Sequence, residues 1–189
     1  MRSNQRTGVA VSNSINGPWQ RMQKALIEPS GPIETLTVNP AIDKDKSGKY
    51  YLVIKGDQPN TTEFLRNQAI ALSNSPLGPF KIQKKPVIDY MDTEDMSIWY
   101  DTERARFYGV FHAHTFIGLI TSQDGINWKK ANEQVLKEKS LKIKRGGILK
   151  PDRMERPFIY CENGEPRVLC LAVKKGDESY TVFIPIGKS

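Results

Sequence analysis

Polar side chains, most of them ionisable, recur near the starts of three strand-like segments, and the carboxyl groups among them suit acid–base catalysis. These residues are Asn39, Asp95 and the adjacent pair Glu155 and Arg156, and they lie 56 to 60 residues apart. If the fold gathers them, the carboxyl groups of Asp95 and Glu155 raise each other's pKa, so one can keep a proton near neutral pH. Arg156 opposes that rise, but its guanidinium can bind a carboxylate or sulfate of a ligand. Because a single Asp or Glu at a strand start is more often a turn residue, the matching positions are what favour a shared site.

Other polar residues near these positions are candidate ligand-binding groups. Lys55 follows the apolar run 51–54, Glu94 precedes Asp95, and His112 and His114 follow the apolar run 107–111. Two histidines at i and i+2 share one face of a strand and can contact one metal. No third ligand is evident, so we favour a hydrogen bond from His112 to a substrate and expect no cofactor. A central cation near His112 is the weaker alternative.

A repeated motif sets the architecture of the chain. The segments GVAVSNSINGPWQR (8–21), AIALSNSPLGPFK (69–81) and GLITSQDGINWKK (118–130) each join a short alternating strand to a Gly-containing turn and an aromatic residue. A two-strand motif precedes the later copies at 39–54 and 95–111 and recurs from residue 155. Several short strands in phase, with turns between them, are typical of a β-propeller built from four-stranded antiparallel blades.

The period fixes the expected blades. At 50 to 60 residues per blade, the 189 residues correspond to about three and a half blades. Propellers usually close with about four to eight blades. We predict an all-β partial propeller with blades at 1–30 (incomplete), 31–91, 92–150 and 151–189. Segment 130–144 is the one weak helix candidate. The recurring aromatics Trp19, Phe80 and Trp128 are expected to pack between blade strands.

The composition excludes several classes of protein. No apolar run approaches the length of a membrane span, about 18 residues, and no signal-peptide pattern starts the chain. The net charge is +7, and the segment from Lys129 to Arg153 carries +6 of it. Lysines of this kind often protect a solvated edge strand; the alternative is a site for an anionic partner. Aromatic residues are not interleaved with the basic ones, so no nucleic-acid partner is predicted.

The repeated motifs of the chain resemble those of the five-bladed β-propeller glycoside hydrolases, in particular relatives of families 43 and 117. The resemblance rests on the order and phase of the segments NPAIDKDKSGKYYLVIKG, SNSPLGPF, EDMSIWYDTERARFYGVFH, TSQDGINW and MERPFIYCENGEP. It implies three carboxylates around the propeller axis. Asp95 resembles the aspartate that tunes the others, although Met96 replaces the usual proline, and Glu155 in Glu-Arg-Pro resembles the general acid. The first-blade base has no counterpart, which implies that its blade precedes Met1.

The resemblance implies hydrolysis of a glycosidic bond and a role in polysaccharide degradation. Catalysis is expected from Glu155 and Asp95, with substrate contacts from Asn39, Lys55, Glu94, His112 and Arg156. A longer parent protein that also carries the first blade is expected to be the glycosidase, and this chain alone is expected to be inactive.

Alternatives remain open at this stage. They are a non-catalytic glycan-binding propeller, a propeller glycoside phosphorylase that uses basic residues to bind phosphate, and a protein-interaction propeller. The expected partner is an oligosaccharide or polysaccharide, anionic if the basic segment contributes, with self-association through open blade edges and no membrane partner. The compartment stays open, including secretion or a periplasmic location for a longer parent.

Overall fold

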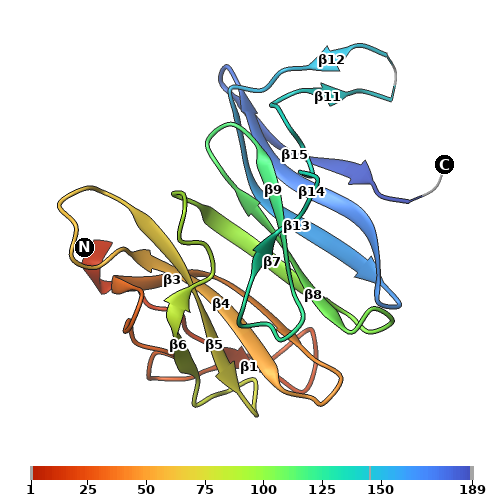
Figure 1. The fold of residues 1–189 in the computed structure, drawn as a ribbon. Coiled ribbons are helices and arrows are strands. Elements are labelled where there is room, and N and C mark those ends of the chain that lie inside the picture. Colours follow the sequence, from red (N-terminus) through yellow and green to blue (C-terminus); the bar gives the residue numbers. More distant parts are fainter. Residues whose placement is uncertain (1, 145, 188–189) are drawn as a thin grey trace.

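The computed structural model describes residues 2–144 and 146–187 and consists almost entirely of antiparallel β-sheet (Figure 1). Among the described residues, the single helical element is the 3-10 turn η1 (Arg2–Asn4). No helix in this part of the chain has the length and apolar character needed to cross a membrane. The weak helix expectation for 130–144 was wrong: a turn and the short strand β11 occupy its end.

Two four-stranded sheets and one three-stranded sheet follow one another along the chain. The first sheet comprises β3 (Glu34–Lys44), β4 (Tyr50–Asp57), β5 (Arg66–Ser73) and β6 (Lys81–Pro86). The second comprises β7 (Glu94–Asp101), β8 (Arg106–His112), β9 (Ile117–Ser122) and β10 (Lys129–Lys130). The third comprises β13 (Arg153–Glu162), β14 (Glu165–Lys175) and β15 (Glu178–Pro185). Two small hairpins form separate two-stranded sheets: β1 (Ala10–Val11) with β2 (Gln20–Arg21), and β11 (Leu141–Lys142) with β12 (Ile148–Leu149).

The sheets pack face to face through separate apolar layers. One layer joins the first two sheets through residues such as Val53, Ile70 and Phe107. A second joins the β7–β10 sheet to the third sheet, with Val110 packed against Leu171 and its neighbours. This succession of twisted meanders, each stacked on the next, is the arrangement of propeller blades. The all-β partial propeller predicted from the repeats is confirmed.

Two local expectations need correction. The third sheet has three strands among the described residues, one fewer than a full blade. Of the recurring aromatics, Phe80 and Trp128 pack against apolar clusters, but Trp19 is 58% exposed. The hairpin that carries Trp19 has only two residues in each strand, so it cannot form the layer that would cover the ring. In the β13–β14 pair, Cys161 lies opposite Pro166 and Cys170 lies opposite Phe158, and both thiols are free.

Candidate active site

The innermost strands of the three sheets share one irregularity, and it positions the candidate site. In β3, β7 and β13 the regular pairing is interrupted between Val38 and Ala41, between Glu94 and Ser97, and between Glu155 and Phe158. A bulge of this kind bends a strand and re-aims a side chain, and it is common beside active sites.

One residue in each bulge has a left-handed backbone. Asn39, Asp95 and Arg156 have φ values of 51°, 54° and 52°. Such a conformation is unusual for residues other than glycine and persists only where the surrounding structure imposes it. The three residues are therefore equivalent positions of three successive blades.

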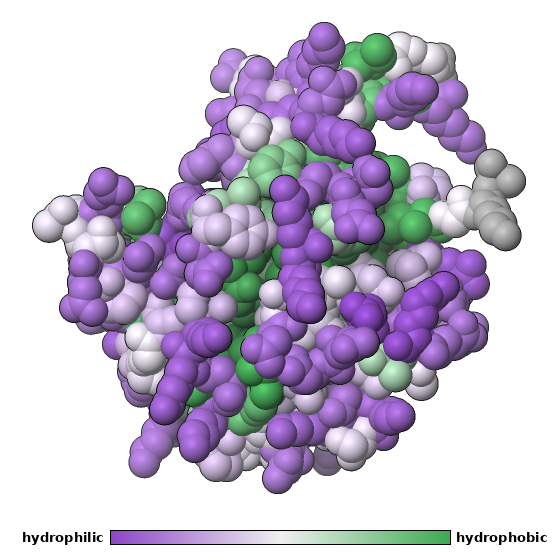
Figure 2. Space-filling view, in the orientation of Figure 1, coloured by the Kyte–Doolittle hydropathy of each residue, from purple (hydrophilic) through white to green (hydrophobic). Residues whose placement is uncertain are grey.

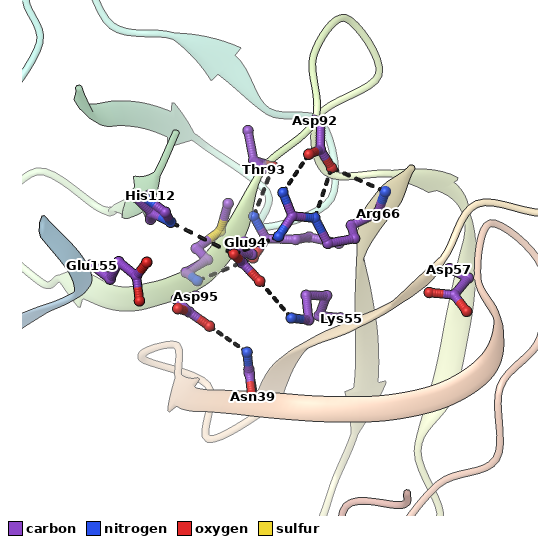
Figure 3. A network of polar contacts seen from close by, with 12 residues as sticks. Asn39, Lys55, Asp57, Arg66, Asp92, Thr93, Glu94, Asp95, His112 and Glu155 are labelled. Carbon is purple, nitrogen blue, oxygen red and sulfur yellow. Dashed lines mark hydrogen bonds and ion pairs between the residues drawn. The ribbon is translucent and has the colours of Figure 1, made fainter. Parts of the chain in front are cut away.

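These bulge residues line one cavity between β3, β7 and β13, with a volume of about 400 Å³. The rest of its lining is mostly apolar and includes Pro40, Met96 and Phe158. The Asn39 side-chain amide donates a hydrogen bond to Asp95 Oδ1 (Figure 3). Three polar groups of different charge thus meet in an apolar pocket on the axis side of the sheets, which is the usual composition of a small-ligand site.

The register shows which member of the Glu155–Arg156 pair occupies the equivalent position. Arg156, and not Glu155, occupies the position that matches Asn39 and Asp95; Glu155 matches Glu94 instead. The Glu155 carboxylate forms an ion pair with Arg153, at 2.8 Å from its Nε. Glu155 lines a different cavity, together with Lys174 and other residues of β14 and β15, although its carboxylate points toward Asp95 in Figure 3.

Glu94 lies at the centre of a network of charged side chains (Figure 3). Lys55 Nζ is 2.6 Å from Glu94 Oε2, and Arg66 Nη1 is 2.5 Å from Oε1. His112, Lys55 and Arg66 together hold the pKa of Glu94 well below its ordinary value. His112 Nδ1 lies 3.8 Å from Glu94 Oε1, too far for a hydrogen bond. Lys55 and Arg66 therefore have the larger effect on the pKa of Glu94. Glu94 is therefore an ionised, positioned carboxylate.

Asp95 has the opposite electrostatic environment. Burial and the negative charge of Glu94 raise its pKa, and Arg156, Lys55 and His112 oppose the rise without reversing it. Adjacent carboxyl groups whose pKa values are shifted in opposite directions are typical of sites that move protons. Within this pocket, Asp95 is the group suited to hold a proton.

Arg66 and its partners extend this network. Arg66 pairs with Asp92 through two hydrogen bonds, and Asp92 also lies 3.3 Å from His114 Nε2. The Arg66 guanidinium and the backbone bond from its N–H lower the pKa of Asp92 against the effect of burial. Asp92 was missed; the only available signal was its place in the acidic run 92–95.

Buried Gln68 fixes the start of β7. Its side chain donates to Thr93 Oγ1 and accepts from the Met96 N–H. A buried amide that makes both bonds holds the backbone on either side of Asp95 in place.

Glu94, Asp95 and His112 also form a cluster in which one ligand atom from each lies within 4.8 Å of the others. His112 is 5% exposed, and its Nδ1 has no hydrogen-bond partner among the described residues. However, Lys55 and Arg66 already neutralise Glu94. This donor set does not fit a divalent cation, because one carboxylate and one imidazole are all that it leaves.

Comparisons with known proteins agree with the fold. No protein-family model matches the sequence, and no curated protein matches it. Among solved structures, a family 43 β-xylosidase/α-arabinofuranosidase from a compost microbial metagenome, in complex with xylotriose, superposes with a TM-score of 0.66 at 19% identity. That match covers 93% of this chain and 61% of the other.

Two further structures extend the comparison. An endo-arabinase from Bacteroides thetaiotaomicron has a TM-score of 0.61 at 15% identity, covering 96% of this chain and 66% of the other. A family 117 glycoside hydrolase from Zobellia galactanivorans has a TM-score of 0.57 at 16% identity, covering 93% and 49%. The chain therefore has the fold of the propeller glycoside hydrolases of families 43 and 117, and it spans about half to two thirds of the length of these three proteins.

Proposed function

We propose that the pocket between β3, β7 and β13 binds a carbohydrate, and that the propeller hydrolyses a glycosidic bond there with Asp95 as the proton donor. The observation that carries the proposal is the state of Asp95. It is a half-buried carboxyl of raised pKa in the axial pocket of a fold shared with glycoside hydrolases.

The chemistry follows from the environment of Asp95. Cleavage of a glycosidic bond requires a proton on the leaving-group oxygen, and a carboxylic acid of raised pKa supplies it. Asn39 donates to Oδ1 and so fixes the orientation of the carboxyl group. Glu94 stays ionised beside it and raises the pKa of Asp95. We propose Glu94, Lys55 and Arg66 as positioning residues.

This assignment replaces Glu155 as the proton donor. Glu155 is absent from the lining of the pocket between β3, β7 and β13, and its carboxylate is paired with Arg153. We propose that Arg156 takes the corresponding place in the pocket and contacts the substrate.

A second function is favoured by one specific feature of the pocket. In the described part of the chain, Asp95 is the sole carboxylate among the lining residues, and Asn39 and Arg156 hold the equivalent positions. Hydrolysis of this type uses two carboxyl groups. A glycan-binding propeller without catalysis needs neither carboxyl group, and this second function agrees with the expectation that this chain alone is inactive.

The experiment compares the wild type with Asp95→Asn, which keeps the shape of the side chain but cannot donate an acid proton. Asp89→Asn is the matched control, because Asp89 is exposed and outside the pocket. Hydrolysis of a panel of chromogenic glycosides is measured together with calorimetric binding of xylotriose and arabinan oligosaccharides.

We expect Asp95→Asn to lose hydrolysis by about 10²–10⁴-fold while oligosaccharide affinity changes only a few-fold. Saccharide binding without turnover in the wild type supports the second function instead. Equal turnover by the wild type and Asp95→Asn excludes Asp95 as the acid, and the absence of saccharide binding excludes both functions.

A further inference from the structure

The β11–β12 hairpin and its flanks form a basic projection, here called the basic arm (residues 139–144 and 146–150). Sequence positions 139–151 contain no Asp or Glu. Lys142, Lys144 and Lys150 are exposed. Figure 1 shows the hairpin standing off the β13–β15 sheet, and in Figure 2 this projection is mostly hydrophilic with an apolar patch.

The arm is anchored at its base. Leu141 is buried and, with Leu149, packs into the apolar layer of the third sheet. Lys139 Nζ donates to the Asp152 carbonyl at 3.1 Å. A fixed base with a projecting tip places the charges of the arm in a definite position relative to the sheet.

The cationic groups on the arm are available to a ligand. Among the described residues, no carboxylate lies within ion-pair distance of Lys142, Lys144 or Lys150, whereas Lys137 just before the arm is paired with Glu133. Ile143 and Ile148 are 49% and 60% exposed beside these lysines. Unneutralised positive charge next to apolar surface attracts a polyanion that also has apolar faces.

The arm is close in sequence to the proposed substrate pocket. Lys150 is six residues from Arg156, which is at most about 21 Å of fully extended chain. Arg156 brings a further positive charge into the pocket itself. An oligomer bound in the pocket can therefore reach the arm.

We propose that the basic arm and Arg156 bind one anionic polysaccharide, whose carboxylate or sulfate groups lie along the arm while one end occupies the axial pocket. The inference deepens the proposed function by naming its substrate class, and it rests on that function. A sugar polymer fits better than a nucleic acid, because sequence positions 139–150 contain no aromatic residue on which bases could stack.

The test uses a double charge reversal, Lys142→Glu/Lys144→Glu. The matched control is Lys84→Glu/Lys85→Glu in β6, where two exposed lysines undergo the same change of charge away from the arm. Calorimetric affinities are measured for oligogalacturonates, which carry carboxylates, for carrageenan oligosaccharides, which carry sulfates, and for neutral xylotriose. Duplex DNA and phosphatidylserine vesicles are the competing polyanions.

We expect the arm variant to bind one or both anionic glycans about tenfold more weakly than the wild type does. The control variant should bind these glycans with wild-type affinity, and the arm variant should bind xylotriose with wild-type affinity. Wild-type binding to the same glycan should weaken as salt rises, because exposed charges are screened within about 8–10 Å. The two anionic glycans distinguish recognition of carboxylate from recognition of sulfate.

Several results would overturn the inference. One is an equal loss of affinity for the anionic glycans in the arm variant and the control. Another is wild-type affinity for DNA or vesicles that matches or exceeds the affinity for the glycans. If xylotriose binds through Asp95 while the arm variant binds the anionic glycans normally, this inference fails and the proposed function stands. If no saccharide of any kind binds, the proposed function fails, and this inference fails with it.

Discussion

Removing the Arg66 side chain should destabilise the protein in a way that depends on pH. The substitution Arg66→Met keeps much of the aliphatic volume and removes the guanidinium, which contacts both Glu94 and Asp92. The side chains of Arg66, Glu94 and Asp92 are only 13%, 18% and 18% exposed, so water replaces the lost partner poorly.

The size of the stability loss depends on which ion-pair partners Glu94 and Asp92 retain. Removing one partner of a buried ion pair costs about 3–5 kcal/mol. Glu94 retains Lys55, and Asp92 lies beside exposed His114, so the loss should fall near the lower end, about 3 kcal/mol. For a chain of this length that corresponds to a fall in melting temperature of roughly 6–12 °C.

The pH dependence has a definite sign. The folded-state pKa values of Glu94 and Asp92 are lowered, so these groups contribute stability that is present above their pKa values in the unfolded chain, about 4. That contribution is lost as the pH falls through the lowered folded values. The gap between wild type and Arg66→Met should therefore be full at pH 7 and narrow below pH of about 4.

Urea denaturation at pH 7 and at a series of lower values measures the effect. Arg104→Met is the control, because Arg104 pairs with Asp101 at 2.6 Å but its own side chain is 60% exposed. The control should show a much smaller loss. A loss for Arg66→Met no larger than that of the control, or one that is the same at every pH, would refute the reasoning.

Three further predictions concern the site and the surface. Asn39→Asp replaces the donor to Asp95 with a second carboxylate, so thermal melts should show a loss of about 2 kcal/mol at pH 7.5 that shrinks toward pH 4.5; a pH-independent loss would contradict this. Gly56→Ala places a Cβ 2.8 Å from a backbone oxygen and should cost about 1–3 kcal/mol in urea denaturation, whereas Gly8→Ala, with open space around it, should cost far less. Phe183→Ser removes an aromatic ring that is 69% exposed on β15, and size-exclusion chromatography should show less self-association than in the wild type; an unchanged profile would exclude this surface.

The architecture could be predicted from the sequence because its signals are local. Alternating apolar residues, turn residues and the recurring Ser-to-aromatic motif each act within about ten residues, and their repetition in phase indicated successive β-sheets. The same periodicity brought Asn39, Asp95 and the segment at 155–156 to equivalent strand starts. The candidate residues Lys55, Glu94 and His112 then followed from their place at strand ends.

Only the tertiary structure decided which side chain enters the pocket. Side chains alternate along a strand, so a shift of one residue exchanges the two faces. The bulge in β13 places Arg156 at the position of Asn39 and Asp95, and Glu155 at the position of Glu94. The charge states were also hidden, because the cations that ionise Glu94 come from β4 and β5, 39 and 28 residues earlier. The pKa of Asp95 rises through burial and the nearby charge of Glu94, and these depend on how the sheets pack in three dimensions, which no local pattern in the sequence records.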